Sequence, residues 1–101
     1  MSSLSLFIVS DSTGETAEHV SHSAMSQFES SFSQVTRFRY VDSEEKVKDI
    51  LQQAALARPV VVCSLVNRNL RRSMALRAQK LGIPFVDLLG SLLELLELRL
   101  G

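Results

Sequence analysis

A short segment near the amino terminus has side chains suited to holding an anion. It contains hydroxyls, carboxylates and one glycine, in the order Ser10, Asp11, Ser12, Thr13, Gly14, Glu15 and Thr16. The segment lies between an apolar run typical of a strand and a pattern typical of a helix, whose first turn presents free N–H groups and the positive end of its dipole. The hydroxyls can donate hydrogen bonds to phosphate oxygens, and Gly14 lets the backbone approach closely. We therefore predict a phosphate-binding turn at these residues.

The same segment has an interpretation that needs no ligand. Ser12 and Glu15 have the spacing of a capping box, in which the two side chains satisfy the first backbone N–H groups of a helix. Asp11 and Glu15 also add negative charge, which opposes a bare phosphate unless a metal or cationic side chains compensate. The residues alone leave both interpretations open.

A second polar segment can supply the missing positive charge. Arg68 and Arg71 follow a valine-rich run that predicts a buried strand, and a guanidinium can donate two parallel hydrogen bonds to phosphate oxygens. With the strand order 2-1-3-4, the turns after the first and third strands face each other at the edge where open α/β sheets bind ligands. We assign Arg68 and Arg71 to the predicted phosphate site, and we expect Arg72, Arg77 and Lys80 to face solvent.

Other reactive side chains give weaker patterns. Asp87 closes the last predicted strand and is expected to cap the final helix, with a metal or a hydroxyl ligand as the alternative. His19 and His22 lie one turn apart without a third His or Cys ligand nearby, so we expect an exposed helix face and predict no metal site. Cys63 lies inside an apolar run and is predicted to be a buried, inert thiol. No catalytic residue can be assigned.

The elements that position these residues alternate along the chain. Partly β-branched apolar runs predict strands at 4–9, 35–41, 59–65 and 83–86, with helical patterns between them. This alternation predicts an α/β fold: a three-layer, open, parallel four-stranded sheet, Rossmann- or flavodoxin-like, in the order 2-1-3-4. The first and third runs are apolar on both faces, whereas 35–41 alternates, which favours an edge strand.

Three helices have recognisable ends or faces. The first should bury a stripe made of Ala17, Val20, Ala24 and Phe28. The second should be capped by Asp42 or Ser43, and the third should begin at Asn67 and end at Gly82. The residues of the third helix expected to face inward are Leu70, Met74, Ala78 and Leu81.

The last helical pattern, at 88–100, is different because its leucines cover most of the circumference. One side of a terminal helix is all that a small domain can cover. We expect either a core helix with a broad stripe or a docking surface for a second subunit or a missing domain.

Composition narrows the classes of protein. The chain has 101 residues, 46% of them apolar, with a formal net charge of zero and one cysteine. This predicts a single domain over 1–101. A neutral balance argues against nucleic acid or a membrane surface as partner, because both are held by excess cationic side chains. With no signal-peptide pattern and no apolar run of spanning length, we expect a cytoplasmic protein.

Several segments together resemble a known bacterial family. They are the run from Phe7 to Ala17, Gln27-Phe28, Ser64-Leu65-Val66 with Leu70-Arg71, and the run from Gly82 to Gly90. In these residues the chain resembles the bifunctional regulatory proteins of phosphoenolpyruvate synthase and pyruvate, phosphate dikinase. The resemblance implies an enzyme that phosphorylates a threonine of its target with ADP, and removes that phosphate by attack of inorganic phosphate, releasing pyrophosphate.

The resemblance also implies what this chain lacks. The family's nucleotide-binding P-loop belongs to a later domain, and no Gly-x-x-x-x-Gly-Lys-Ser/Thr motif occurs here. We therefore expect an amino-terminal domain that is inactive alone, with ADP, phosphate and Mg²⁺ belonging to the intact protein. Two alternatives stay open: a flavodoxin-like FMN-binding domain, suggested by Ser12 to Thr16, and a non-catalytic phosphate-sensing module.

Overall fold

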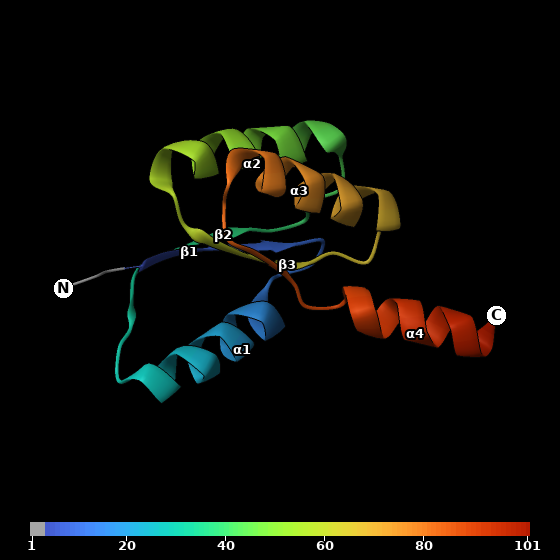
Figure 1. Ribbon diagram of the computed structural model, residues 1–101, viewed down its shortest axis with the longest axis horizontal. Helices are drawn as coiled ribbons and strands as arrows, with labels where there is room; N and C mark the ends of the chain where they lie inside the picture. Colours follow the sequence, from blue (N-terminus) through green and yellow to red (C-terminus); the bar gives the residue numbers. More distant parts are fainter. Residues whose placement is uncertain (1–3) are drawn as a thin grey trace.

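The computed structural model describes residues 4–101, which form one parallel sheet with helices on both faces (Figure 1). The strands are β1 (Leu4–Ser10), β2 (Phe32–Phe38), β3 (Val60–Ser64) and β4 (Phe85–Asp87). The helices are α1 (Glu15–Met25), the short 3-10 helix η1 (Ser26–Phe28), α2 (Glu44–Ala57), α3 (Arg68–Leu81) and α4 (Gly90–Leu100). The strand order is β2-β1-β3-β4. The predicted α/β class and strand order are confirmed.

The layers are unequal. Helices α2 and α3 lie side by side over one face of the sheet, whereas α1 covers part of the other face (Figure 1). The larger core cluster lies on the α2/α3 side and includes Phe7, Val9, Val61 and Met74. The smaller cluster, on the α1 side, consists of Leu6, Ile8, Ala17 and Val62. Strand β1 is therefore buried on both faces, as its continuous apolar run predicts.

The second strand lies three residues earlier than the sequence predicts. Strand β2 ends at Phe38, and Tyr40 has a left-handed backbone with φ 54°. Past the strand, the N–H of Tyr40 donates to the Ser12 carbonyl at 3.0 Å, and that of Val41 to the Ser10 carbonyl at 2.9 Å. The apolar pattern of 35–41 continues because Val41 is buried beneath the turn. The predicted edge position of this strand is confirmed.

The predicted ends of the second and third helices are confirmed. Ser43 Oγ accepts from the Lys46 N–H at 3.2 Å, and Asn67 Oδ1 accepts from the Leu70 N–H at 3.0 Å. Gly82 ends α3 in the left-handed conformation, φ 68°, which glycine adopts without strain. The N-cap position of α4 is Leu89, which makes no side-chain cap hydrogen bond. Asp87 nevertheless binds the start of α4, because its Oδ1 accepts from the N–H groups of Leu89 and Gly90.

The predicted burial of two helix stripes is wrong in part. On α1, Ala17 is buried, but Val20 and Ala24 are exposed and Phe28 in η1 is 76% exposed. The reason is that, among residues 4–101, no other helix packs beside α1 on its face of the sheet, so its apolar stripe borders an open surface. On α3, Leu81 is 41% exposed because it lies in a groove between α2 and α3 rather than over a strand.

The last helix packs on neither face of the sheet and projects from the edge where the strands end (Figure 1). Its exposed leucines are Leu92, Leu95, Leu96, Leu98 and Leu100. Within residues 4–101, no helix combines the length and apolar character needed to cross a bilayer. Of the two predictions for this helix, the core helix is wrong.

Candidate phosphate-binding site

The turns after β1 and β3 lie together at the carboxyl edge of the sheet, as the strand order predicts. Asp11 joins them, because its Oδ2 accepts a hydrogen bond from the Val66 N–H at 2.8 Å. Ser10 is buried, and its Oγ accepts from the Ser12 N–H at 3.0 Å. Asp11 and Ser10 therefore shape the turn through backbone hydrogen bonds.

The first turn of α1 has no side-chain cap. The helix begins at Glu15, and its N-cap residue is Gly14, with φ 86° and no hydrogen bond from a side chain. The predicted capping box of Ser12 and Glu15 is therefore wrong. Left-handed Gly14 places the helix start beyond the reach of the exposed Ser12, whose carbonyl pairs with Tyr40 instead. The first-turn N–H groups of α1 stay open to solvent or to a ligand.

The other predicted residues of the turn differ in how tightly they are held. Thr13 is half-buried, whereas Glu15 and Thr16 are exposed on the first turn of α1. Gly14 is buried, and a Cβ on it would lie 3.0 Å from the Ile8 side chain. Glycine is thus required here both for the positive φ and for the close approach to β1.

Arg71 is buried at the same edge, with 6% of its surface exposed. Its Nη1 lies 3.5 Å from Asp87 Oδ2, a long distance for an ion pair. Among the described residues its Nε has no hydrogen-bond partner. A buried guanidinium with an unsatisfied N–H is unfavourable unless another acceptor completes its hydrogen bonds.

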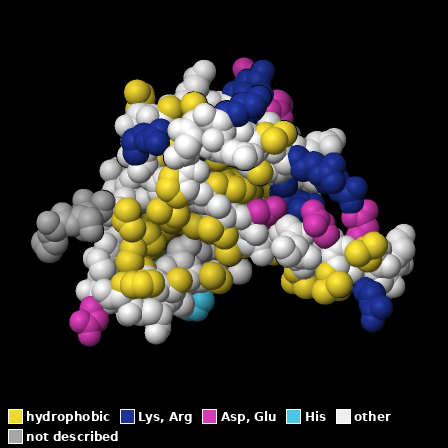
Figure 2. Space-filling model, viewed as in Figure 1, with side chains coloured by type: hydrophobic (Ala, Val, Ile, Leu, Met, Phe, Trp, Pro, Cys, Tyr) yellow, Lys and Arg dark blue, Asp and Glu magenta, His cyan; other side chains and the backbone are white. Residues whose placement is uncertain are grey.

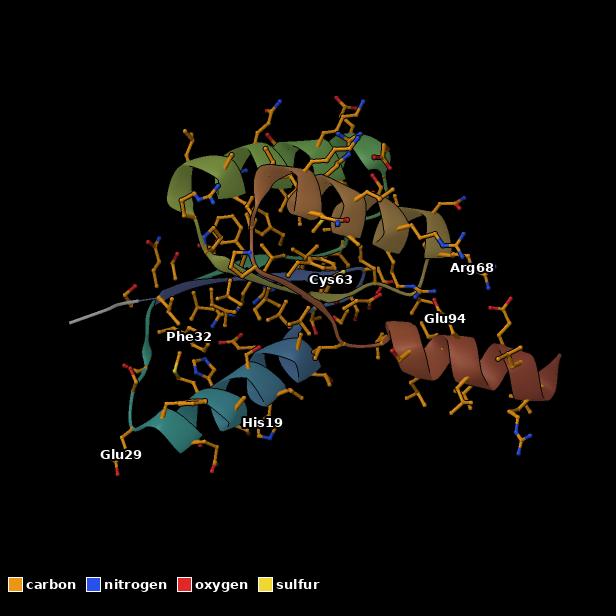
Figure 3. All side chains as sticks on the ribbon, viewed as in Figure 1. His19, Glu29, Phe32, Cys63, Arg68 and Glu94 are labelled. Carbon is orange, nitrogen blue, oxygen red and sulfur yellow. The ribbon has the colours of Figure 1, made fainter. Side chains whose placement is uncertain are left out.

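Arg68 is more exposed and points toward the last helix (Figure 3). It forms an ion pair with Glu97 of α4. Both arginines line a cavity of about 460 Å³ between the turn after β3 and α4, together with Val66, Leu93, Leu96, Glu97 and Leu100. The structure therefore brings Arg68 and Arg71 together, and the Asp11–Val66 hydrogen bond joins their turn to residues 10–16.

Cys63 lies in the centre of the sheet beneath this edge (Figure 3). Burial first, and then the nearby carboxylates of Asp87 and Asp11, raises the pKa of its thiol to about 12. The predicted burial of Cys63 is confirmed. With this pKa the thiol is protonated at neutral pH, so we expect it to react slowly.

Sequence reasoning missed Glu97. No spacing rule connects Glu97 with Arg68, because 29 positions separate them and the direction of α4 brings them together. A charged residue within a leucine-rich helix was the one available signal.

The profile of the kinase/pyrophosphorylase family matches residues 6–101 of the chain. The chain belongs to the kinase/pyrophosphorylase family. The resemblance drawn from the segments around residues 7–17 and 82–90 is thereby confirmed. The match gives no support to the FMN-binding alternative.

Individual relatives agree with this family. A Listeria welshimeri protein named "Putative pyruvate, phosphate dikinase regulatory protein 1" is 38% identical over 97 residues, covering 96% of this chain and 35% of its own. A Carboxydothermus hydrogenoformans protein named "Putative pyruvate, phosphate dikinase regulatory protein" is 40% identical over 89 residues, covering 88% of this chain and 32% of its own. The kinase/pyrophosphorylase chain described here thus spans about a third of the length of the curated relatives it matches.

The described residues of this kinase/pyrophosphorylase chain form no ligand cluster for the Mg²⁺ that the family implies. In the part of the chain that the structure describes, no three His, Cys, Asp or Glu side chains gather into a metal site. Asp11 and Asp87 lie nearest the edge, and each already accepts hydrogen bonds from backbone N–H groups. These residues are therefore not assigned as Mg²⁺ ligands.

Proposed function

We propose that this chain is the amino-terminal part of a cytoplasmic enzyme that regulates a pyruvate, phosphate dikinase or a phosphoenolpyruvate synthase by reversible threonine phosphorylation. In this proposal the chain's own contribution is an oxyanion site at the carboxyl edge of the sheet, which binds phosphoryl oxygens. Membership of the kinase/pyrophosphorylase family and the names of the relatives support the first part. Nucleotide binding and phosphoryl transfer belong to the intact protein.

The observation that carries the oxyanion site is the unpartnered Nε of Arg71. The free energy cost of burying a guanidinium falls when all its N–H groups are hydrogen-bonded. The acceptor that it does have, Asp87 Oδ2, is 3.5 Å away. Arg71 also lines the neighbouring cavity. A phosphate oxygen bound there would give its guanidinium group a charged acceptor, and hydrogen bonds between charged groups are about twice as strong as neutral ones.

The electrostatics of the edge favour an anion held by both arginines. Asp11 and Asp87 direct one oxygen each to backbone N–H groups, which offset part of their charge. Arg68 is paired with Glu97 on the exposed side of the cavity. Exposed ion pairs contribute about 0 to 1 kcal/mol, so an incoming phosphate can compete with Glu97 for Arg68. The uncapped first turn of α1 adds further donors at the same edge.

Titration of the 15N-labelled chain with phosphate and with pyrophosphate, followed by NMR, tests this site. We expect shifts of the backbone amides at 10–17 and 66–71. Arg71→Gln should raise the dissociation constant about tenfold or more, because it removes a charged donor. The control is Arg72→Gln, since Arg72 is an exposed neighbour on α3. If Arg71→Gln fails to fold, Arg71→Lys and Arg68→Gln are the replacements.

Two outcomes would exclude the oxyanion site. One is the absence of shifts at millimolar phosphate and pyrophosphate. The other is equal binding by the folded Arg71 variant and the wild-type chain.

A second experiment tests the division of labour with the intact protein. We expect the 101-residue chain, supplied with ADP, Mg²⁺ and a pyruvate, phosphate dikinase, to transfer no phosphate to threonine. Phosphoryl transfer needs a cradle for the phosphates and a positioned metal, which these residues do not form. Phosphothreonine detected by mass spectrometry on the dikinase would contradict the proposal.

A further inference from the structure

An apolar groove lies on the face of the sheet that α1 covers incompletely. It has a volume of about 770 Å³, and its walls come from α1, η1, residues 29–31 and the strands β1, β2, β3 and β4. Figure 2 shows hydrophobic side chains gathered in a hollow on this side of the molecule. Val86 and Phe28 on its walls are 46% and 76% exposed. Isolated apolar residues are normal on a surface, but a continuous hollow of this kind marks an interaction site.

Helix α4 carries a second apolar surface on the same chain. Its side toward α3 lines the arginine cavity with Leu93, Leu96, Glu97 and Leu100. The opposite side carries Leu95 and Leu98, which are 55% and 82% exposed, flanked by Leu92 and Arg99. This second stripe has no partner within residues 4–101, and Figure 2 shows hydrophobic side chains along the projecting helix.

Three contacts hold α4 away from the groove of its own chain. Asp87 Oδ1 accepts from the N–H of Gly90 at 2.9 Å, which sets the direction in which the helix leaves β4. Gly90 packs so closely on Asp87 that a Cβ there would lie 2.3 Å from Oδ2. Glu97 is paired with Arg68. With these contacts formed, α4 presents its leucines outward, where a second molecule can reach them.

We propose that the groove is occupied by α4 of a second copy of this chain, in a two-fold exchange that covers both grooves and both helices. A two-fold dimer uses the same surfaces on each copy, and this chain carries both members of the pair. The sizes agree: the eleven residues of α4 span about 16.5 Å at 1.5 Å per residue, and the five residues of β3 span about 16.5 Å at 3.3 Å per residue.

Charge complementarity supports the same occupant. Glu29 lies at the end of the groove farthest from the carboxyl edge (Figure 3). A helix that enters from the carboxyl edge and runs antiparallel to the strands places its last turn there, and the last turn of α4 carries Arg99. Neither Glu29 nor Arg99 forms an ion pair within residues 4–101 of one chain, so each is available to the other across the interface.

Sedimentation equilibrium of the 101-residue chain, from micromolar to millimolar concentration, tests the exchange. We expect the average mass to rise from 11.2 kDa toward twice that value. Leu95→Glu should raise the dimer dissociation constant about tenfold or more, because it places a charge in an apolar groove. The matched control is Leu56→Glu, since Leu56 is 89% exposed on α2, away from both surfaces, and should leave the constant unchanged.

Charge reversal identifies the occupant. Glu29→Arg and Arg99→Glu should each weaken the dimer, and the double variant should restore it. In a mixed sample, one copy carries a nitroxide on Ser91→Cys and no isotope, and the other copy is 15N-labelled without a nitroxide. The nitroxide should broaden the amide signals of Val62, Val86 and Leu88 in the 15N-labelled copy. A constant mass of 11.2 kDa at millimolar concentration would overturn the exchange. The exchange would also be overturned if the groove signals broadened only when the nitroxide and the 15N isotope were on the same copy. That result would indicate that α4 docks into the groove of its own chain.

Discussion

Arg71 is the one charged side chain that folding buries among residues 4–101, and its surroundings define the chemistry of the carboxyl edge. Its charged neighbour is Asp87, whose second oxygen is bound to the amides that begin α4. A single carboxylate therefore supports both the arginine and the direction of the helix. The candidate oxyanion site and helix α4 are linked at Asp87.

Gly90→Ala tests that link. Alanine normally stabilises a helix relative to glycine by up to about 1 kcal/mol. Here a Cβ would lie 2.3 Å from Asp87 Oδ2 and 3.2 Å from Arg71 Nη1. Asp87 would have to move, and it would lose its hydrogen bonds to the amides of Leu89 and Gly90 and its ion pair with Arg71. We expect a net loss of about 1–3 kcal/mol in the free energy of unfolding, measured by urea denaturation.

The comparison variant for this measurement is Ser91→Ala, because Ser91 is exposed in the same turn of α4. It should change the free energy of unfolding by less than about 0.5 kcal/mol. Equal stability of the Gly90 variant and the wild type would mean that Asp87 does not fix the start of α4.

The Cys63 thiol predicts a pH dependence of stability. Burial raises its pKa in the folded chain to about 12 from the ordinary value of 9.0. The unfolded thiol therefore ionises first, so this contribution to stability is complete below pH 9 and is lost as the pH rises toward 12. We expect Cys63→Ala to flatten the stability curve in that range relative to the wild type, measured by urea denaturation between pH 8 and pH 11.

Reaction with a thiol reagent provides an independent reading. The native chain should react with iodoacetamide far more slowly than the urea-unfolded chain at the same pH. Fast modification of the native protein at pH 8 would show that the thiol is accessible, contrary to its burial.

At the scale of the elements, the two helices that start at the carboxyl edge differ at their amino ends. Helix α3 is capped by Asn67, whereas α1 follows the left-handed Gly14 without a side-chain cap. Side-chain caps satisfy the first N–H groups internally, so α3 has less need of a ligand. The uncapped start of α1 is the part of the turn that keeps its donors free.

Removing the cap of α3 should lower stability without affecting the candidate site directly. Asn67→Ala removes the 3.0 Å hydrogen bond to the Leu70 N–H, and such caps contribute about 1 kcal/mol. We expect a loss of that size in thermal or urea unfolding. Asn69→Ala, two positions along on the exposed side of α3, is the matched control and should be close to neutral. Equal effects of the two changes would argue against a specific cap.

At the scale of the whole molecule, the two faces of the sheet are covered unequally. The α2/α3 face holds the larger core, and the other face keeps a groove beside α1. Helix α4 is attached through its first turn and the Arg68–Glu97 pair. Local stability should therefore decrease from the central strands to the last helix.

Native-state hydrogen exchange at micromolar concentration should reveal this order. The amides of β1 and β3 should exchange through global unfolding, and those of α4 through local opening with a much smaller free energy. Raising the protein concentration should increase the protection of the α4 amides if the proposed dimer forms. Equal protection of α4 and β1 at the lowest concentration would contradict the predicted order.

The elements and their arrangement could be predicted from residue types and their spacing. The apolar runs and helical patterns predicted the α/β class and the order 2-1-3-4. Local signals of a few residues also placed the caps at Ser43, Asn67 and Gly82 correctly. Such features depend on neighbours along the chain, which is why periodicity and residue type suffice to predict them.

The contacts between distant residues became known from the folded structure. It assigned Asp11 to Val66 and Arg68 to Glu97, and it replaced the expected cap at Ser12 with Gly14. It also left Val20 and Phe28 beside an open groove, although their spacing is that of a buried stripe. The physical reason is that burial and ion pairing depend on which element covers which face, and that is set by packing between segments far apart in the chain.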